Sequence, residues 1–209
     1  MTAPEILTDV TDGVATVTLN RPEVHNAFND RVIAELTGTF SRLGADPTVR
    51  AVVLRASGKS FSAGADLGWM QRMAGYGFDE NLADARQLAE LMRTLNDLPK
   101  PTVALVQGAA FGGGVGLVAC CDVALAADTA TFCLSEVKLG LIPAVISPYV
   151  VQAIGARAAR RYFLTAERFS ALQAKALGLV HEVVPAVMLE AALLKILDAL
   201  AEGGPNAHA

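Results

Sequence analysis

The sequence predicts an α/β fold, and three observations carry this prediction. Apolar runs of strand length alternate with amphipathic segments of helical period along the whole chain. The chain has 209 residues, of which 53% are hydrophobic and 18% charged, so one domain with a large buried core is expected. No linker-like segment divides the chain before residue 185.

The N-terminal part predicts a hairpin, a helix and a buried strand. Residues 5–20 contain two apolar runs joined at Asp12-Gly13, a dipeptide typical of hairpin turns. Asn29 or Asp30 suits the N-cap of a helix. The apolar residues that follow recur with period 3.6, namely Val32, Ile33, Leu36, Phe40 and Leu43. The short apolar run 51–54 predicts a buried strand.

The next section predicts a loop and a long helix. Residues 56–68 are mostly small and favour a loop, and a polar section with Gly75 and Gly77 follows. Residues 82–98 have the pattern of an amphipathic helix, which the prolines after it end.

An uncharged stretch between Lys100 and Asp122 is long enough to cross a bilayer. Its composition argues against a transmembrane helix, because it begins with a proline, contains the polar Gln107 and includes five glycines. We therefore predict a buried strand over 102–106, a glycine loop, and a buried helix from about Gly114.

The remainder continues the alternation of strands and helices. The predicted elements are strands at 123–126 and 130–133, helical patterning over 143–165, a helix at 170–177 ended by Gly178, a strand at 179–184 and a helix at 186–201.

Composition excludes several classes of protein. The chain has 17 Lys+Arg against 21 Asp+Glu and no long basic run, so no nucleic-acid partner is expected. Cys120, Cys121 and Cys133 form neither a disulfide framework nor a metal knuckle, and no metal is predicted. Residues 1–6 lack a signal-peptide pattern, so a cytoplasmic location is expected.

Two glycine-containing loops, 60–67 and 107–116, each follow a predicted buried strand. Glycine lets backbone N–H groups approach a ligand, and N–H groups from two such loops can converge on one oxygen and stabilise an oxyanion. The spacing is neither that of a dinucleotide-binding fingerprint nor that of a P-loop.

Taken together, the two loops resemble the two signatures of the enoyl-CoA hydratase/isomerase (crotonase) superfamily. The matching segments are Phe61-Ser-Ala-Gly-Ala-Asp66, Val106-Gln-Gly-Ala-Ala-Phe-Gly-Gly-Gly114 with Ala119-Cys-Cys-Asp122, Leu19-Asn-Arg-Pro22 with Asn26-Ala-Phe28, the segment from Phe132 through Glu136 to Pro143, and Gly178 to Val184. The resemblance covers residues 5 to 200.

The resemblance implies a crotonase-like spiral of ββα units and an acyl-CoA thioester substrate, with no separate cofactor because CoA is part of the substrate. It implies that the N–H groups of Ala65 and Gly113 form the oxyanion hole and that Glu136 is the catalytic acid or base. A carboxylate near an apolar acyl pocket is expected to have a raised pKa. The other residues expected to contact the substrate are Val24, Ala27, Ala63, Asp66, Leu67, Trp69, Met70, Gly112, Gly116, Pro143 and Val145.

The sequence departs from the family at one catalytic position. Family hydratases place a glutamate where this chain has Gly116, so Glu136 is the one carboxylate retained. Three readings stay open. The first is hydration of a 2-enoyl-CoA, which we prefer. The second is 3,2-enoyl-CoA isomerisation by the lone Glu136. The third is a non-catalytic acyl-CoA binder.

The segment 143–150, together with 65–70, resembles a bacterial methylglutaconyl-CoA hydratase-like branch. The resemblance also divides the chain into a spiral core, 1–185, and the start of a truncated C-terminal helical region, 186–209. It implies a homotrimer or hexamer and no membrane partner. An exposed apolar face is expected near 186–200.

Overall fold

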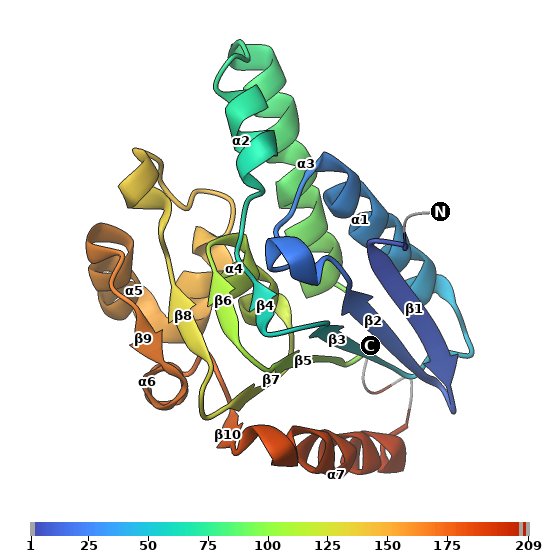
Figure 1. Cartoon of the computed structure of the whole chain (residues 1–209). Coiled ribbons are helices and arrows are strands. Elements are labelled where there is room, and N and C mark those ends of the chain that lie inside the picture. Colours follow the sequence, from blue (N-terminus) through green and yellow to red (C-terminus); the bar gives the residue numbers. More distant parts are fainter. Residues whose placement is uncertain (1–2, 205–206, 208–209) are drawn as a thin grey trace.

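The computed structural model describes residues 3–204 and residue 207, and consists of two sheets with helices around them (Figure 1). The larger sheet has six strands in the order β1-β2-β3-β5-β7-β10. Their bounds are β1 Ile6–Thr11, β2 Val14–Leu19, β3 Ala51–Ala56, β5 Thr102–Val106, β7 Val123–Ala127 and β10 Glu182–Val184. Strands β1 and β2 are antiparallel, and every later pairing in this sheet is parallel.

The hairpin and the first helix confirm the sequence prediction. Asp12 and Gly13 have φ values of 51° and 80°, as a two-residue hairpin turn with both central residues left-handed requires. Helix α1, Asp30–Ala45, begins after Asn29, whose side chain accepts a hydrogen bond from the Val32 N–H. The apolar stripe of this helix is buried against the core.

The smaller sheet has four short strands in the order β4-β6-β8-β9. They are β4 Ser60–Ser62, β6 Ala109–Phe111, β8 Thr131–Cys133 and β9 Phe169–Ser170. Three times in succession the chain passes from a strand of the large sheet to a strand of the small sheet and then to helix: β3 to β4, β5 to β6, and β7 to β8. This repetition confirms the predicted spiral of ββα units.

The helices after each pair of strands complete the units. They are α2 Leu67–Met73, α3 Phe78–Asn96, α4 Gly113–Cys120, α5 Ser147–Thr165, α6 Ala171–Leu177 and α7 Leu189–Glu202, with short 3₁₀-helices η1 Pro22–Val24, η2 Glu136–Leu139 and η3 Ala186–Met188. Gly155 has non-helical angles within α5 and interrupts that helix.

Three predictions about this part of the chain were wrong. The predicted loop 56–68 contains β4 and the start of α2, and the glycine loop contains β6. Each of these two strands has three residues, which is too short for a period of two to be visible in the sequence. Helix α3 begins at Phe78 rather than at 82, because the Glu80 side chain accepts the Gly77 N–H and stabilises an earlier start.

The C-terminal helix covers a second apolar cluster on the large sheet. Leu189, Ala192 and Leu193 of α7 are buried against residues of β3, β5 and β7, and Figure 1 shows α7 in red along this side of the sheet. Val187 and Leu194 remain 89% and 59% exposed, which agrees with the expected apolar face. Residues 205–206 and 208–209 of the predicted C-terminal region lie outside the described residues. Among the residues with described structure, no helix is long and apolar enough to cross a bilayer.

Candidate active site

The structure brings the two glycine-containing loops into contact. A Cβ placed on Gly64 would lie 2.9 Å from the carbonyl oxygen of Phe111, and one placed on Gly114 would lie 2.9 Å from that of Ser62. Gly64 also has a φ of 87°, which side-chain-bearing residues rarely adopt. The two backbones therefore approach as closely as they do only because these positions are glycine.

Ala65 lies near the end of the first loop, and its N–H points away from Phe28, the residue with which it pairs. It forms a parallel bridge with Phe28, in which the Phe28 N–H donates to Gly64 and the Asp66 N–H donates to the Phe28 carbonyl. The N–H of Ala65 itself donates to no acceptor within residues 3–204. Ala65 is exposed, so this N–H is available to a ligand.

Gly113 is the first residue of α4, where an N–H group has no partner inside the helix. The N–H of Gly113 donates to no acceptor in the described part of the chain. The positive end of the helix dipole favours negative charge at this position. Ala65 and Gly113, the two predicted oxyanion donors, therefore both have unused N–H groups on loops that touch.

The absence of a side chain at Gly113 has a cause that the sequence did not reveal. In the structure a Cβ at Gly113 would lie 2.7 Å from Cε2 of Phe28, so the phenyl ring already occupies that side of the residue.

Glu136, the predicted acid or base, begins the 3₁₀-helix η2 and lies beside the second loop. A Cβ at Gly112 would lie 3.2 Å from Oε1 of Glu136, which places the carboxylate next to the residue that precedes Gly113. The other oxygen, Oε2, is buried and has no hydrogen-bond partner among the described residues. Burial raises the pKa of the Glu136 carboxyl above its usual range.

This raised pKa predicts how stability depends on pH. The unfolded chain loses the Glu136 proton at the ordinary pKa of a glutamate, whereas the folded protein holds it to higher pH. The folded state therefore binds more protons between these two pKa values, and stability falls as pH rises through that window. We expect Glu136→Gln to raise the Tm at pH 7 relative to the unsubstituted protein, and the difference to vanish at pH 4. Equal Tm differences at both pH values would contradict the burial of this carboxylate.

Gly116, the position at which family hydratases carry a second glutamate, faces an apolar side chain. A Cβ at Gly116 would lie 2.3 Å from Cγ2 of Ile146 and 3.3 Å from Cε of Met92. Ile146 is 3% exposed and Met92 is fully buried. Gly112 is the residue before α4 and Gly116 lies in its first turn, so Glu136 lies beside the start of this helix and Ile146 lies against its first turn.

The residues expected to hold CoA lie on two adjacent loops. The Ala63 N–H donates to His25, which ties the loop containing Ala63 to the one containing Val24 and Ala27. Arg21 lies between them: it donates to the carbonyl of Ala27 at 2.7 Å and contacts Asp66 at 3.2 Å.

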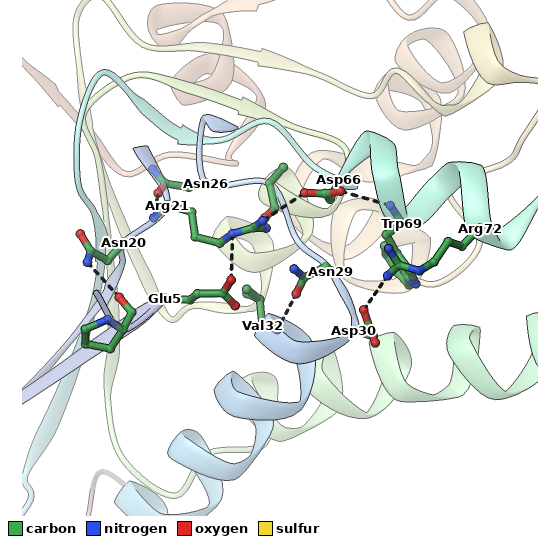
Figure 2. Close-up of polar contacts among 12 residues, drawn as sticks. Glu5, Asn20, Arg21, Asn26, Asn29, Asp30, Val32, Asp66, Trp69 and Arg72 are labelled. Atoms are coloured by element: carbon green, nitrogen blue, oxygen red, sulfur yellow. Dashed lines mark hydrogen bonds and ion pairs between the residues drawn. The ribbon is translucent and has the colours of Figure 1, made fainter. Parts of the chain in front are cut away.

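Figure 2 shows Arg21 between Glu5 and Asp66, and Asp66 capping the helix that carries Trp69. Partial burial acts to raise the pKa of Asp66, but hydrogen bonds from the Trp69 N–H and from Arg21 outweigh it and hold that pKa below its usual range. Asp66 therefore fixes the start of α2 as an ionised group. Its predicted contact with CoA stays a prediction.

The remaining residues predicted to contact the substrate are divided between core and surface. Trp69 is 5% exposed, and its indole N–H donates to Asp84 of α3. Met70 and Val145 are half-buried, Pro143 is buried, and Leu67 is 75% exposed. Gly112 has a φ of 50° and donates its N–H to the Cys133 carbonyl. Their contacts with the substrate stay predictions.

Sequence reasoning missed Phe28, Arg21 and Ile146. Arg21 and Phe28 lie within segments that carry the family resemblance, and Ile146 lies in the segment 143–150, but no local pattern in these segments shows what each side chain contacts. Phe28 contacts Gly113, and Ile146 contacts Gly116, across long stretches of chain. Only the fold reveals these contacts.

Comparisons with known proteins agree with this geometry. The family model for enoyl-CoA hydratase/isomerase matches residues 9–209. The crystal structure of an enoyl-CoA hydratase from Shewanella pealeana superposes with a TM-score of 0.96 at 49% identity, and covers 98% of this chain and 77% of that one. An enoyl-CoA hydratase structure from Mycobacterium smegmatis gives a TM-score of 0.94 at 35% identity, with 99% and 80% covered.

Curated sequences are also similar over most of this chain. The enoyl-CoA hydratase AFT6-1 of Alternaria alternata is 37% identical over 206 residues, which is 94% of this chain. The chain spans 64% of the length of that relative, and 68% of a relative from Thermus thermophilus that is 42% identical.

Proposed function

Because the chain belongs to the enoyl-CoA hydratase/isomerase family, we propose that it is an enzyme that adds water to a 2-enoyl-CoA thioester, which gives a 3-hydroxyacyl-CoA. The observation that carries this proposal is the arrangement of three groups. Two unused N–H groups, on Ala65 and Gly113, lie on touching loops, and the Glu136 carboxylate lies beside the second of them.

The proposed reaction needs only these groups. Glu136 removes a proton from water as the water oxygen bonds to C3 of the substrate. The electrons of the double bond move toward the thioester oxygen, where the N–H groups of Ala65 and Gly113 donate hydrogen bonds to the developing enolate. The protonated Glu136 then returns its proton to C2. The raised pKa makes the Glu136 carboxylate a stronger base for the first step than an ordinary glutamate.

Isomerisation of a 3-enoyl-CoA to a 2-enoyl-CoA is the second candidate. The apolar contact of Gly116 with Ile146 favours it, because the position of a possible second carboxylate is filled. In this reaction Glu136 removes a proton from C2 to form a dienolate and returns the proton to C4. One carboxylate is sufficient for that transfer.

The acyl group of the substrate, the metabolic role and the assembly of the protein are further proposals. We propose a branched, methylglutaconyl-like acyl group and a role in leucine breakdown, which the sequence of the 143–150 segment supports. We also propose assembly as a homotrimer or hexamer in the cytoplasm. A substrate profile over straight and branched enoyl-CoA thioesters tests the first feature, and light scattering of the purified protein tests the assembly.

One labelling experiment separates the candidate functions. The protein is incubated with crotonyl-CoA in water enriched in ¹⁸O, and separately with a 3-enoyl-CoA. Label in the C3 hydroxyl supports hydration, and double-bond migration without oxygen uptake supports isomerisation. The absence of both reactions, with acyl-CoA still bound, would contradict both and leave a binding protein.

A further inference from the structure

Phe28 contacts both of the loops that carry the candidate oxyanion donors. Its backbone pairs with the first loop: the Phe28 N–H donates to Gly64 at 2.7 Å, and the Asp66 N–H donates to the Phe28 carbonyl at 2.7 Å. These two hydrogen bonds hold the residues on either side of Ala65. The direction of the Ala65 N–H is therefore set by the backbone of Phe28.

The side chain of the same residue supports the second loop. A Cβ on Gly113 would lie 2.7 Å from Cε2 and 3.2 Å from Cδ2 of Phe28, so the ring lies directly against Gly113. Phe28 is 1% exposed, so neighbouring side chains enclose the ring. A phenyl ring is rigid and has only two side-chain torsions, which makes it a spacer of fixed thickness.

Phe28 is itself held in place by a buried polar residue. Asn26, two residues earlier and 2% exposed, donates through Nδ2 to the carbonyls of Ser57 and Ser60 at 2.8 Å each. The hydroxyl of Ser62 donates to the Asn26 carbonyl at 2.8 Å. The backbone that carries Phe28 is thus tied to residues 57–62, which lead into and begin the first loop.

We propose that Phe28 is a positioning residue that sets the separation and orientation of the Ala65 and Gly113 N–H groups. The inference rests on the proposed function, since it assigns those groups to a thioester oxygen. Backbone donors stabilise an oxyanion only when both lie within hydrogen-bond distance of the same atom, and displacements of about 0.5 Å weaken such sites. A smaller side chain at Phe28 lets Gly113 move relative to Ala65.

The test compares Phe28→Leu with Phe40→Leu. Phe40 is equally buried, but it lies in α1 and makes no hydrogen bond with either loop, so it controls for the loss of a core ring. For Phe28→Leu we expect kcat to fall about 10- to 100-fold, because loss of one oxyanion donor costs about 100- to 1,000-fold. KM is expected to change less than about threefold. Phe40→Leu is expected to leave both constants within about twofold at a temperature where it is folded.

A spectroscopic measurement reports on the donors directly. Butyryl-CoA labelled with ¹³C at the thioester carbonyl is bound to each protein, and its carbonyl stretching frequency is compared with that of the free compound. We expect a shift to lower frequency in the unsubstituted protein and in Phe40→Leu, and a smaller shift in Phe28→Leu. If Phe28→Leu does not fold, Phe28→Met provides the same comparison with a side chain that adapts to gaps.

The outcomes separate the inference from the function on which it rests. Equal carbonyl shifts and equal kcat in the Phe28 and Phe40 variants would overturn the positioning role while leaving the proposed function intact. An unshifted carbonyl in the unsubstituted protein would overturn the oxyanion assignment, and the inference with it. Loss of activity in both variants to the same extent would show a general packing effect and would also overturn the inference.

Discussion

Glu136→Gln is expected to lower kcat by about 100- to 10,000-fold, the range that general acid–base catalysis contributes. Glutamine keeps the size of the side chain but can neither remove a proton from water nor return one to carbon. The candidate oxyanion donors belong to the backbone and remain in place, so the affinity for an acyl-CoA is expected to change little. Steady-state kinetics gives kcat, and calorimetry with butyryl-CoA gives the affinity.

Glu35 provides a matched control for this substitution. Glu35 lies on the exposed side of α1, and Glu35→Gln is expected to leave turnover unchanged. If Glu136→Gln retained full activity, Glu136 would be removed from the mechanism. The pH dependence of turnover adds a second check. On the acidic side turnover falls as the catalytic base, which must be ionised, takes up a proton. Burial of Glu136 places this fall above the usual pKa of a glutamate.

Gly116→Glu is expected to destabilise the protein by about 3 kcal/mol or more, the scale of burying an unpaired charge in an overpacked core. The new Cβ alone would lie 2.3 Å from Cγ2 of Ile146 and 3.3 Å from Cε of Met92. Chemical denaturation of the variant measures this loss. A variant as stable as the original protein would show that the face of α4 around Gly116 is open.

A second substitution, Ile146→Gly, tests whether contact with Ile146 causes this loss of stability. We expect Gly116→Glu to cost less stability in the Ile146→Gly background than in the original one, because the obstructing side chain is gone. The double variant also carries a carboxylate on α4 in addition to Glu136 of η2, so its hydration rate is expected to exceed that of Ile146→Gly alone. Additive stability losses in the double-mutant cycle would contradict direct contact between these positions.

The sequence predicted the parts of the fold that depend on neighbouring residues. The Asp12-Gly13 turn, the Asn29 cap and the buried run 102–106 are visible locally and were confirmed. Strands β4 and β6 were missed because three residues carry no period, and their pairing brings together segments far apart in the chain. The same limit applies to the candidate site.

Motif positions indicated Ala65, Gly113 and Glu136, and the structure places all three at or beside the two touching loops. The reasons for the neighbouring glycines were not predictable. Gly113 faces a ring from residue 28, and Gly116 faces a side chain from residue 146. Each contact joins segments separated by many residues, so only the folded chain shows why a side chain is excluded there.

The second apolar cluster has a consequence for how the protein is made. Residues of β3, β5 and β7 on that side of the large sheet are covered by Leu189, Ala192 and Leu193, which lie late in the chain. During synthesis the strands emerge from the ribosome well before their cover does. That face of the sheet is therefore exposed in the nascent chain until α7 docks, and this interval is when chaperone binding or aggregation is expected to compete with folding.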